Sequence, residues 1–168
     1  MTPDFLPDTA LLFSIEGIRF ALPVSTVERI IRAVAIAPLP DAPPNVLGMI
    51  NVHGKAIAVL SLRRRIGLNE RDIEAEDQFI LALVSGRTIA LVADCTDGLI
   101  SLHPEAATEI DAVISGATLI KGILKVGSDL VLLQDLEAFL SPDEQVSLVE
   151  ALSAREYAAD NHPACATR

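Results

Sequence analysis

Tryptophan is absent from this 168-residue sequence, and cysteine and histidine are scarce, with two and three copies. Cys95 and Cys165 have neither the number nor the spacing for a disulfide framework or a cysteine-based zinc site, so we expect both to be free thiols. The histidines, His53, His103 and His162, are scattered and lack H-x-x-x-H spacing. The sequence therefore predicts no bound metal and no cofactor.

Basic residues are also in short supply. The chain has 13 Lys and Arg against 23 Asp and Glu, which gives a formal net charge of −10. Nucleic-acid binding draws on clustered Lys and Arg, and the only cluster is Arg63-Arg64-Arg65, which we interpret as a solvated helix face. We therefore expect no nucleic-acid partner and a free protein that its acidic charge keeps monomeric.

Long hydrophobic runs are missing as well. No run reaches the ~18 residues that a membrane-spanning helix requires. The N-terminus carries Asp4 and Asp8 and lacks the positive start of a secretory signal. These absences predict a cytoplasmic protein without membrane insertion.

Catalytic motifs are not found either. Gly48, Gly54 and Lys55 resemble a phosphate-binding loop, but five residues separate the glycines where that loop has four, and Ala56 stands where it has Ser or Thr. The run that follows is apolar and branched, which favours a strand over the helix such a loop needs. No G-x-S-x-G or G-x-G-x-x-G motif occurs, so we expect that the protein is not an enzyme.

The residues that are present favour short strands. Hydrophobic residues make up 51% of the chain and fall in short runs separated by turn residues. Four pairs of runs have the spacing of β-hairpins: 11–15 with 18–22, 48–52 with 56–60, 79–84 with 88–93, and 120–126 with 130–133. A further strand is expected at 98–102.

Short helices are expected at three capping residues. Ser25 and Glu28 form a capping box that predicts a helix with Val27, Ile30 and Ile31 on one side. Ser61 predicts a two-turn helix that ends at Gly67, and Asp135 predicts a short helix to Leu140.

The C-terminal part predicts a longer amphipathic helix over 141–160. Ser141 and Glu144 form a capping box with Pro142 at the first helical position, and Val146, Val149 and Leu152 follow three residues apart. We expect this stripe to pack on the protein's own core in preference to a partner. Residues 1–9 are interpreted as a flexible leader and 161–168 as a tail.

An internal repeat unites the hairpins. Placed at an offset of 74 without a gap, residues 48–62 match residues 122–136: glycine meets glycine, Val52 meets Val126, and Ser61 meets Asp135, both good helix caps. The order of strand, turn, strand, cap and helix recurs in register. The sequence thus predicts a mainly β fold of two similar small barrels with short helices.

Residues 10–140 resemble the CheW-like family, the adaptor domain of bacterial chemotaxis arrays. The central pattern is G-x-I-N-x-x-G-x-x-x-x-V-x-x-L-R-x-R-x-G-L, which this chain carries as Gly48, Ile50, Asn51, Gly54, Val59, Leu62, Arg63, Arg65, Gly67 and Leu68. Further marks are the runs 12–15, 23–30, 89–94 and 130–133. A chain of this length resembles the stand-alone adaptor.

The resemblance implies two five-stranded SH3- or OB-like barrels around one core. It also implies a non-catalytic adaptor that couples the tip of a methyl-accepting chemoreceptor, held in a groove between the barrels, to the regulatory domain of the histidine kinase CheA. The candidate receptor-binding residues that it suggests are Val27, Arg29, Ile30, Gly48, Asn51 and His53.

Two of these candidates depart from the family pattern. The family usually has Arg at the position of His53 and often an acid at the position of Arg29. An Arg carries a permanent charge and a fork of donors, whereas His offers at most two donors and a charge that depends on pH. These changes predict altered receptor contacts, and they leave open an alternative: a CheW-like regulatory or sensory module that binds a small ligand or a different output protein.

Overall fold

The structure is a computed structural model that describes residues 6–103, 107–109 and 120–160. Part of the predicted leader and the whole of the predicted tail, with His162 and Cys165, lie outside the described residues. No described helix is long and apolar enough to cross a membrane.

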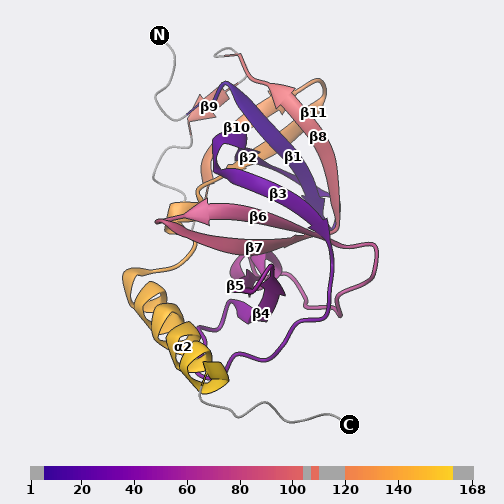
Figure 1. Cartoon of the computed structure of the whole chain (residues 1–168). Coiled ribbons are helices and arrows are strands. Elements are labelled where there is room, and N and C mark those ends of the chain that lie inside the picture. Colours follow the sequence, from indigo (N-terminus) through magenta and orange to yellow (C-terminus); the bar gives the residue numbers. More distant parts are fainter. Residues whose placement is uncertain (1–5, 104–106, 110–119, 161–168) are drawn as a thin grey trace.

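The fold is mainly β, as predicted, and its strands form two sheets that lie one above the other (Figure 1). The first sheet has the order β8 (Cys95–Ser101), β1 (Thr9–Ile15), β2 (Ile18–Pro23), β11 (Asp129–Gln134), β10 (Ile120–Val126) and β9 (Ala107–Glu109). The second has the order β3 (Val27–Arg32), β6 (Gln78–Val84), β7 (Arg87–Ala93), β5 (Lys55–Leu60) and β4 (Val46–Val52). All four predicted hairpins form. In the first sheet, β9 is a sixth strand that the sequence did not predict.

The internal repeat is confirmed residue by residue. Hairpin β4–β5 and hairpin β10–β11 have the same register at an offset of 74, and each shifts register at the corresponding residue. The shift falls between the pairs Val46↔Leu60 and Gly48↔Val59 in one hairpin, and between Ile120↔Gln134 and Gly122↔Leu133 in the other. β5 then pairs in parallel with β7, and β11 in parallel with β2, so the two halves share one topology.

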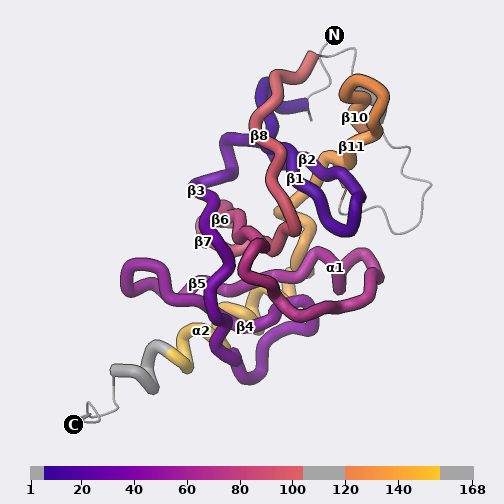
Figure 2. The backbone as a smooth tube through the Cα atoms, turned by 90° about the vertical axis from the view of Figure 1, so that its right-hand side faces the viewer, coloured from indigo at the N-terminus to yellow at the C-terminus, as the bar shows by residue number. Residues whose placement is uncertain are grey.

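The halves exchange a strand. β3 follows β2 along the chain but pairs with β6 in the second sheet, and β8 follows β7 but pairs with β1 in the first. In Figure 2, β8 lies beside β1 and β3 lies beside β6. Each sheet therefore depends on a strand from the other half, which makes separate folding of the halves unfavourable.

The described residues bury three hydrophobic clusters. The largest lies between the sheets and includes Phe13, Phe20, Leu60 and Leu91, with the two Phe ring centroids 5.4 Å apart. The other two lie on the opposite faces of the sheets, one around Leu124 and one around Phe79. Strands such as β1 and β7 are buried on both faces, which explains why their sequences are continuous apolar runs and do not alternate.

The helix predicted at Ser25 is wrong. Only a 3-10 turn, η1 (Val24–Thr26), is present, and the chain then enters strand β3. Val27 pairs with Ala82 and Ile31 with Phe79 in an antiparallel ladder. A capping box contributes only about 1 kcal/mol, so the ladder and the preference of branched residues for strands prevail.

The other predicted helices form in shorter or altered versions. α1 (Leu62–Arg65) is a single turn instead of two, and the Ser61 hydroxyl accepts its hydrogen bond from the Arg64 amide. Asp135 caps a 3-10 turn, η4 (Leu136–Ala138), through the Glu137 amide.

The last helix, α2, spans Pro142–Asp160, and its capping box is reciprocal. The Ser141 amide donates to the Glu144 carboxylate at 2.8 Å, and the Glu144 amide donates to the Ser141 hydroxyl at 3.2 Å. The helix packs on the protein's own core, as predicted, but only Leu152 of the predicted stripe is buried, because Val146 and Val149 are exposed. The buried face is instead formed by Leu148, Ala151 and Leu152, which join the cluster between the sheets.

Candidate functional site

The six candidate residues lie on two neighbouring segments of the second sheet. Strand β3 carries Val27, Arg29 and Ile30, and hairpin β4–β5 carries the other three. β3 and β4 are the two edge strands of this sheet. The chain after β3 bridges the edges, because Ala37 and Met49 exchange two backbone hydrogen bonds of 2.8 Å. The fold thus brings together segments about twenty residues apart.

Arg29 and His53 are in direct contact. Nη1 of Arg29 lies 3.3 Å from Nε2 of His53, and both side chains are exposed. A guanidinium only donates, so in a hydrogen bond between these two atoms the imidazole Nε2 is the acceptor. The two residues that depart from the family pattern therefore form one pair.

The turn that presents His53 is held by Asn51. His53 and Gly54 have φ values of 51° and 83°, as the two central residues of a type I′ turn require. The Asn51 Oδ1 accepts a hydrogen bond of 2.8 Å from the Gly54 amide. Asn51 thus stabilises the left-handed backbone at His53 and fixes where the imidazole lies.

Gly48 is buried and has a clear part in this geometry. A Cβ at this position would lie 2.6 Å from Cγ2 of Ile36 and would also collide with the Ala37 carbonyl. Its φ of 154° is a further reason for glycine. Gly48 therefore allows the chain after β3 to pass over β4.

The exposed members of the set form what we call the hairpin surface: Arg29, Ile30, Asn51 and His53. Val27 is half-buried and packs against the cluster between the sheets. Ile30 is 39% exposed, and because it directly follows Arg29 on β3, its side chain points to the opposite face of the sheet. The hydrogen-bond donors of the hairpin surface are therefore concentrated at Arg29 and His53.

A second polar cluster joins the two sheets. The Arg63 side chain is only 11% exposed, and its Nη2 lies 2.8 Å from Oδ2 of Asp94 while its Nη1 lies 3.2 Å from Oε2 of Glu16. The prediction that this Arg lies on a solvated face is therefore wrong. Burial raises the pKa of Asp94, but the Glu16 amide and the guanidinium of Arg63 outweigh it, so the pKa lies below its usual value.

Arg71 extends this cluster from the loop between α1 and β6. Its Nη2 lies 2.6 Å from Oδ1 of Asp77 and 2.8 Å from Oδ1 of Asp94. Burial again raises the pKa of Asp77, yet its hydrogen bonds with Arg71 and the Glu74 amide bring the pKa below its usual value. Each of these carboxylates is paired with a cation. The cluster therefore stabilises the packing of α1 and the loop before β6 against the end of β7.

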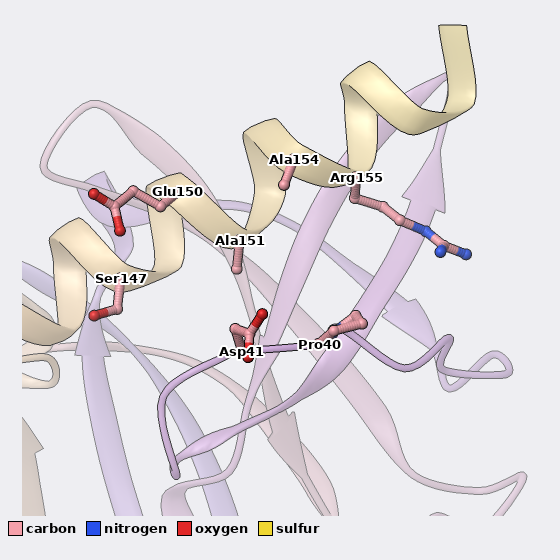
Figure 3. A pocket seen from close by; sticks show the side chains of 7 residues that line it. All are labelled: Pro40, Asp41, Ser147, Glu150, Ala151, Ala154 and Arg155. Atoms are coloured by element: carbon pink, nitrogen blue, oxygen red, sulfur yellow. The ribbon is translucent and has the colours of Figure 1, made fainter. Parts of the chain in front are cut away.

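Helix α2 and the loop 38–44 border an open surface hollow of about 590 Å³. It is lined by Pro40, Asp41, Ser147, Glu150, Ala151, Ala154 and Arg155. Figure 3 shows Ala151 pointing toward Asp41 and the Arg155 guanidinium reaching away from the helix beyond Pro40. Arg155 also lines a second hollow of about 250 Å³ that includes Asn51 and Gly54. Sequence reasoning missed both hollows, because they depend on where α2 docks.

The described residues include no group of three or more His, Cys, Asp or Glu side chains that could hold a metal ion. Cys95 is an exposed free thiol at the start of β8.

This fold and this site define a β-protein of two interlocked, barrel-like sheets whose candidate site is an exposed surface at a hairpin. The chain belongs to the CheW-like domain family, whose pattern matches residues 9–144.

Comparison with characterised proteins agrees. The chain is 24% identical to Chemotaxis protein CheW of Treponema pallidum over 131 residues, which cover 74% of this chain and 77% of the relative. It is 25% identical to Chemotaxis protein CheW of Bacillus subtilis over 144 residues, 83% of this chain and 90% of the relative. The crystal structure of scaffolding protein TtCheW from Thermoanaerobacter tengcongensis superposes with a TM-score of 0.75 at 21% identity, covering 83% of this chain and 96% of that one.

Proposed function

We propose that this protein is a non-catalytic adaptor of the cytoplasm that couples methyl-accepting chemoreceptors to the histidine kinase CheA. The observation that carries the proposal is the family match over residues 9–144, which includes both sheets and the hairpin surface. On this proposal, the candidate residues Val27, Arg29, Ile30, Asn51 and His53 serve receptor binding, and Gly48 shapes the strand beneath them.

The physical properties of the site suit an adaptor. A small exposed surface supports transient contacts, and repetition of such contacts in an array raises the effective concentration without any new interaction. The second sheet has its edges bridged at Ala37 and Met49, which leaves little free edge for unwanted strand pairing.

Reconstitution tests this function. The purified protein is combined with the kinase and with membranes that carry a chemoreceptor of the same organism, and kinase autophosphorylation is measured with and without the protein. We expect stimulation that needs all three components. Pull-down with the receptor tip and with the kinase regulatory domain separates the two contacts, and binding to neither would overturn the proposal.

A second candidate function is a sensory module that binds a small ligand. The hollow between α2 and the loop 38–44, at about 590 Å³, has the volume of a small-molecule site. A metabolite panel followed by thermal denaturation tests this candidate. A saturable stabilisation that Ala151→Trp abolishes would support it, and no shift together with strong kinase binding would eliminate it.

A further inference from the structure

We propose that Arg29 and His53 together bind a carboxylate of the chemoreceptor, so that this adaptor selects receptors with an acidic side chain at the contact. The inference rests on the proposed function and specifies the chemistry of the partner. It is carried by the local charge and by the unused donors of the pair.

The local charge is opposite in sign to that of the whole protein. The net charge is −10, yet three cations come from the segments that meet at this hairpin. Arg29 contacts His53, Lys55 follows two residues later in the chain, and Arg155 of α2 lines a hollow together with Asn51 and Gly54. Within the described residues, no carboxylate lies within 4.0 Å of the cationic nitrogens of Arg29, His53 or Lys55.

The nearest acid along β3 is already engaged. Glu28 accepts a hydrogen bond of 2.9 Å from the Thr88 hydroxyl on β7, which holds it against the sheet. By contrast, eight of the nine ion pairs among the described residues join Arg19, Arg63, Arg64 or Arg71 to acids of this chain. The guanidinium of Arg29 can therefore pair with a carboxylate of another protein.

The pair has the donors that a carboxylate needs. Arg29 has five N–H groups, and within the described part of the chain only one of them has a partner, the imidazole of His53. A carboxylate can accept two parallel bonds from the guanidinium. Protonated at Nε2, His53 would add a third donor to the same acceptor.

A consequence for pH follows from the change of partner. An opposite charge favours the charged form of an imidazole, so a receptor carboxylate at this site would favour an imidazole that donates to it. Receptor affinity should therefore rise as the pH falls from 8 to 5.5, by about three- to tenfold.

A charge-reversal titration tests the proposal. Calorimetry measures binding of the full-length protein to the purified cytoplasmic tip of a chemoreceptor from the same organism. Arg29→Glu should weaken binding by about tenfold or more, because it sets like charges against each other. Lys125→Glu is the matched control: it makes the same change of net charge on exposed β10 of the other sheet, and it should alter binding by less than about twofold.

The outcomes separate the two levels of the proposal. Equal affinity of the wild type and a folded Arg29→Glu variant would overturn this inference while leaving the adaptor function intact. Failure of the wild type to bind any receptor tip would overturn the adaptor function and this inference with it. A charge swap would identify the carboxylate. An acidic residue of the tip is changed to Lys, and recovery of affinity for the Arg29→Glu variant shows that this residue is the partner of Arg29.

The histidine is tested through pH. His53→Asn keeps a residue that tolerates the left-handed backbone but does not titrate. The wild type should bind more tightly at pH 5.5 than at pH 8, and His53→Asn should show a flat profile. The same slope in both proteins would overturn the role of His53 in the carboxylate site.

Discussion

Arg63 and Asp94 form a forked ion pair, with Nη2 of the arginine 2.8 Å from Oδ2 and 3.0 Å from Oδ1 of the aspartate. Arg63 lies on α1, which follows β5 of the second sheet. Asp94 lies between β7 of the second sheet and β8 of the first sheet. Asp94 also accepts the amide of Glu16, in the turn of hairpin β1–β2, at 2.7 Å. The pair therefore stabilises the connection from β7 to β8, where the chain passes from the second sheet to the first.

Removing this arginine should destabilise the protein substantially. Arg63→Met keeps the apolar stem but leaves Asp94 partly buried without its main cation, so we expect a loss of about 3 kcal/mol in the free energy of unfolding. Urea denaturation measures it. Arg64→Met is the matched control, because Arg64 pairs with Glu70 at the surface, and it should cost about 1 kcal/mol or less. Equal losses would contradict the structural role of the buried pair.

The free energy of unfolding should decrease at acidic pH. Asp77 and Asp94 both have a pKa below the usual 3.8 in the folded protein, so the unfolded chain binds protons first as the pH drops. Their contribution is complete above the usual pKa and is lost as the pH falls through it toward the lower folded pKa. Denaturation between pH 7 and pH 3 should show the loss. Asp77→Asn should be less stable at pH 7 and show a shallower decline, and an unchanged slope would argue against this linkage.

Gly48 should be far less replaceable than Gly54. A Cβ on Gly48 meets Ile36 and the Ala37 carbonyl, whereas a Cβ on Gly54 meets nothing within 4 Å. Gly48→Ala should therefore cost about 3 kcal/mol or more, through collision and lost backbone bonds. Gly54→Ala carries only the strain of its φ of 83°, about 1 kcal/mol. Thermal and urea unfolding of both variants check the order.

The packing of helix α2 on the core should depend on the face that carries Leu148. Leu148 is 2% exposed and Val146 is 57% exposed, although they lie only two residues apart. Leu148→Ala should cost about 2–4 kcal/mol, and Val146→Ala should cost less than about 0.5 kcal/mol. If Val146→Ala were the more damaging, the face of α2 that the structure assigns to the core would be wrong.

Much of the fold could be read from the sequence because its determinants are local. Apolar runs separated by Glu16-Gly17, His53-Gly54 and Ser85-Gly86 identify the hairpins, since each pair supplies two residues with positive φ. The repeat at an offset of 74 likewise predicted two similar halves. The sequence misled at Ser25, where a good capping box competes with a strand ladder that comes from residues fifty positions away.

The candidate site was predicted only in part. The resemblance selected Arg29 and His53, but their contact at 3.3 Å depends on the bridge between the edges of the second sheet. Arg63 was assigned to solvent, because a run of three arginines does not reveal that one of them meets Asp94 and Glu16. No local signal marks such a pairing, since its partners are distant in sequence.

The four hairpins with their turns, the caps of α1 and α2, and the repeated halves were determined by the sequence alone, because backbone preference and hydrogen bonds within a few residues decide them. Whether residues 27–32 form a helix or a strand, which face of α2 is buried and which arginine is paired inside the protein were decided by the tertiary structure. These outcomes depend on the exchange of β3 and β8 between the sheets, which sets side chains against neighbours that no short stretch of sequence contains.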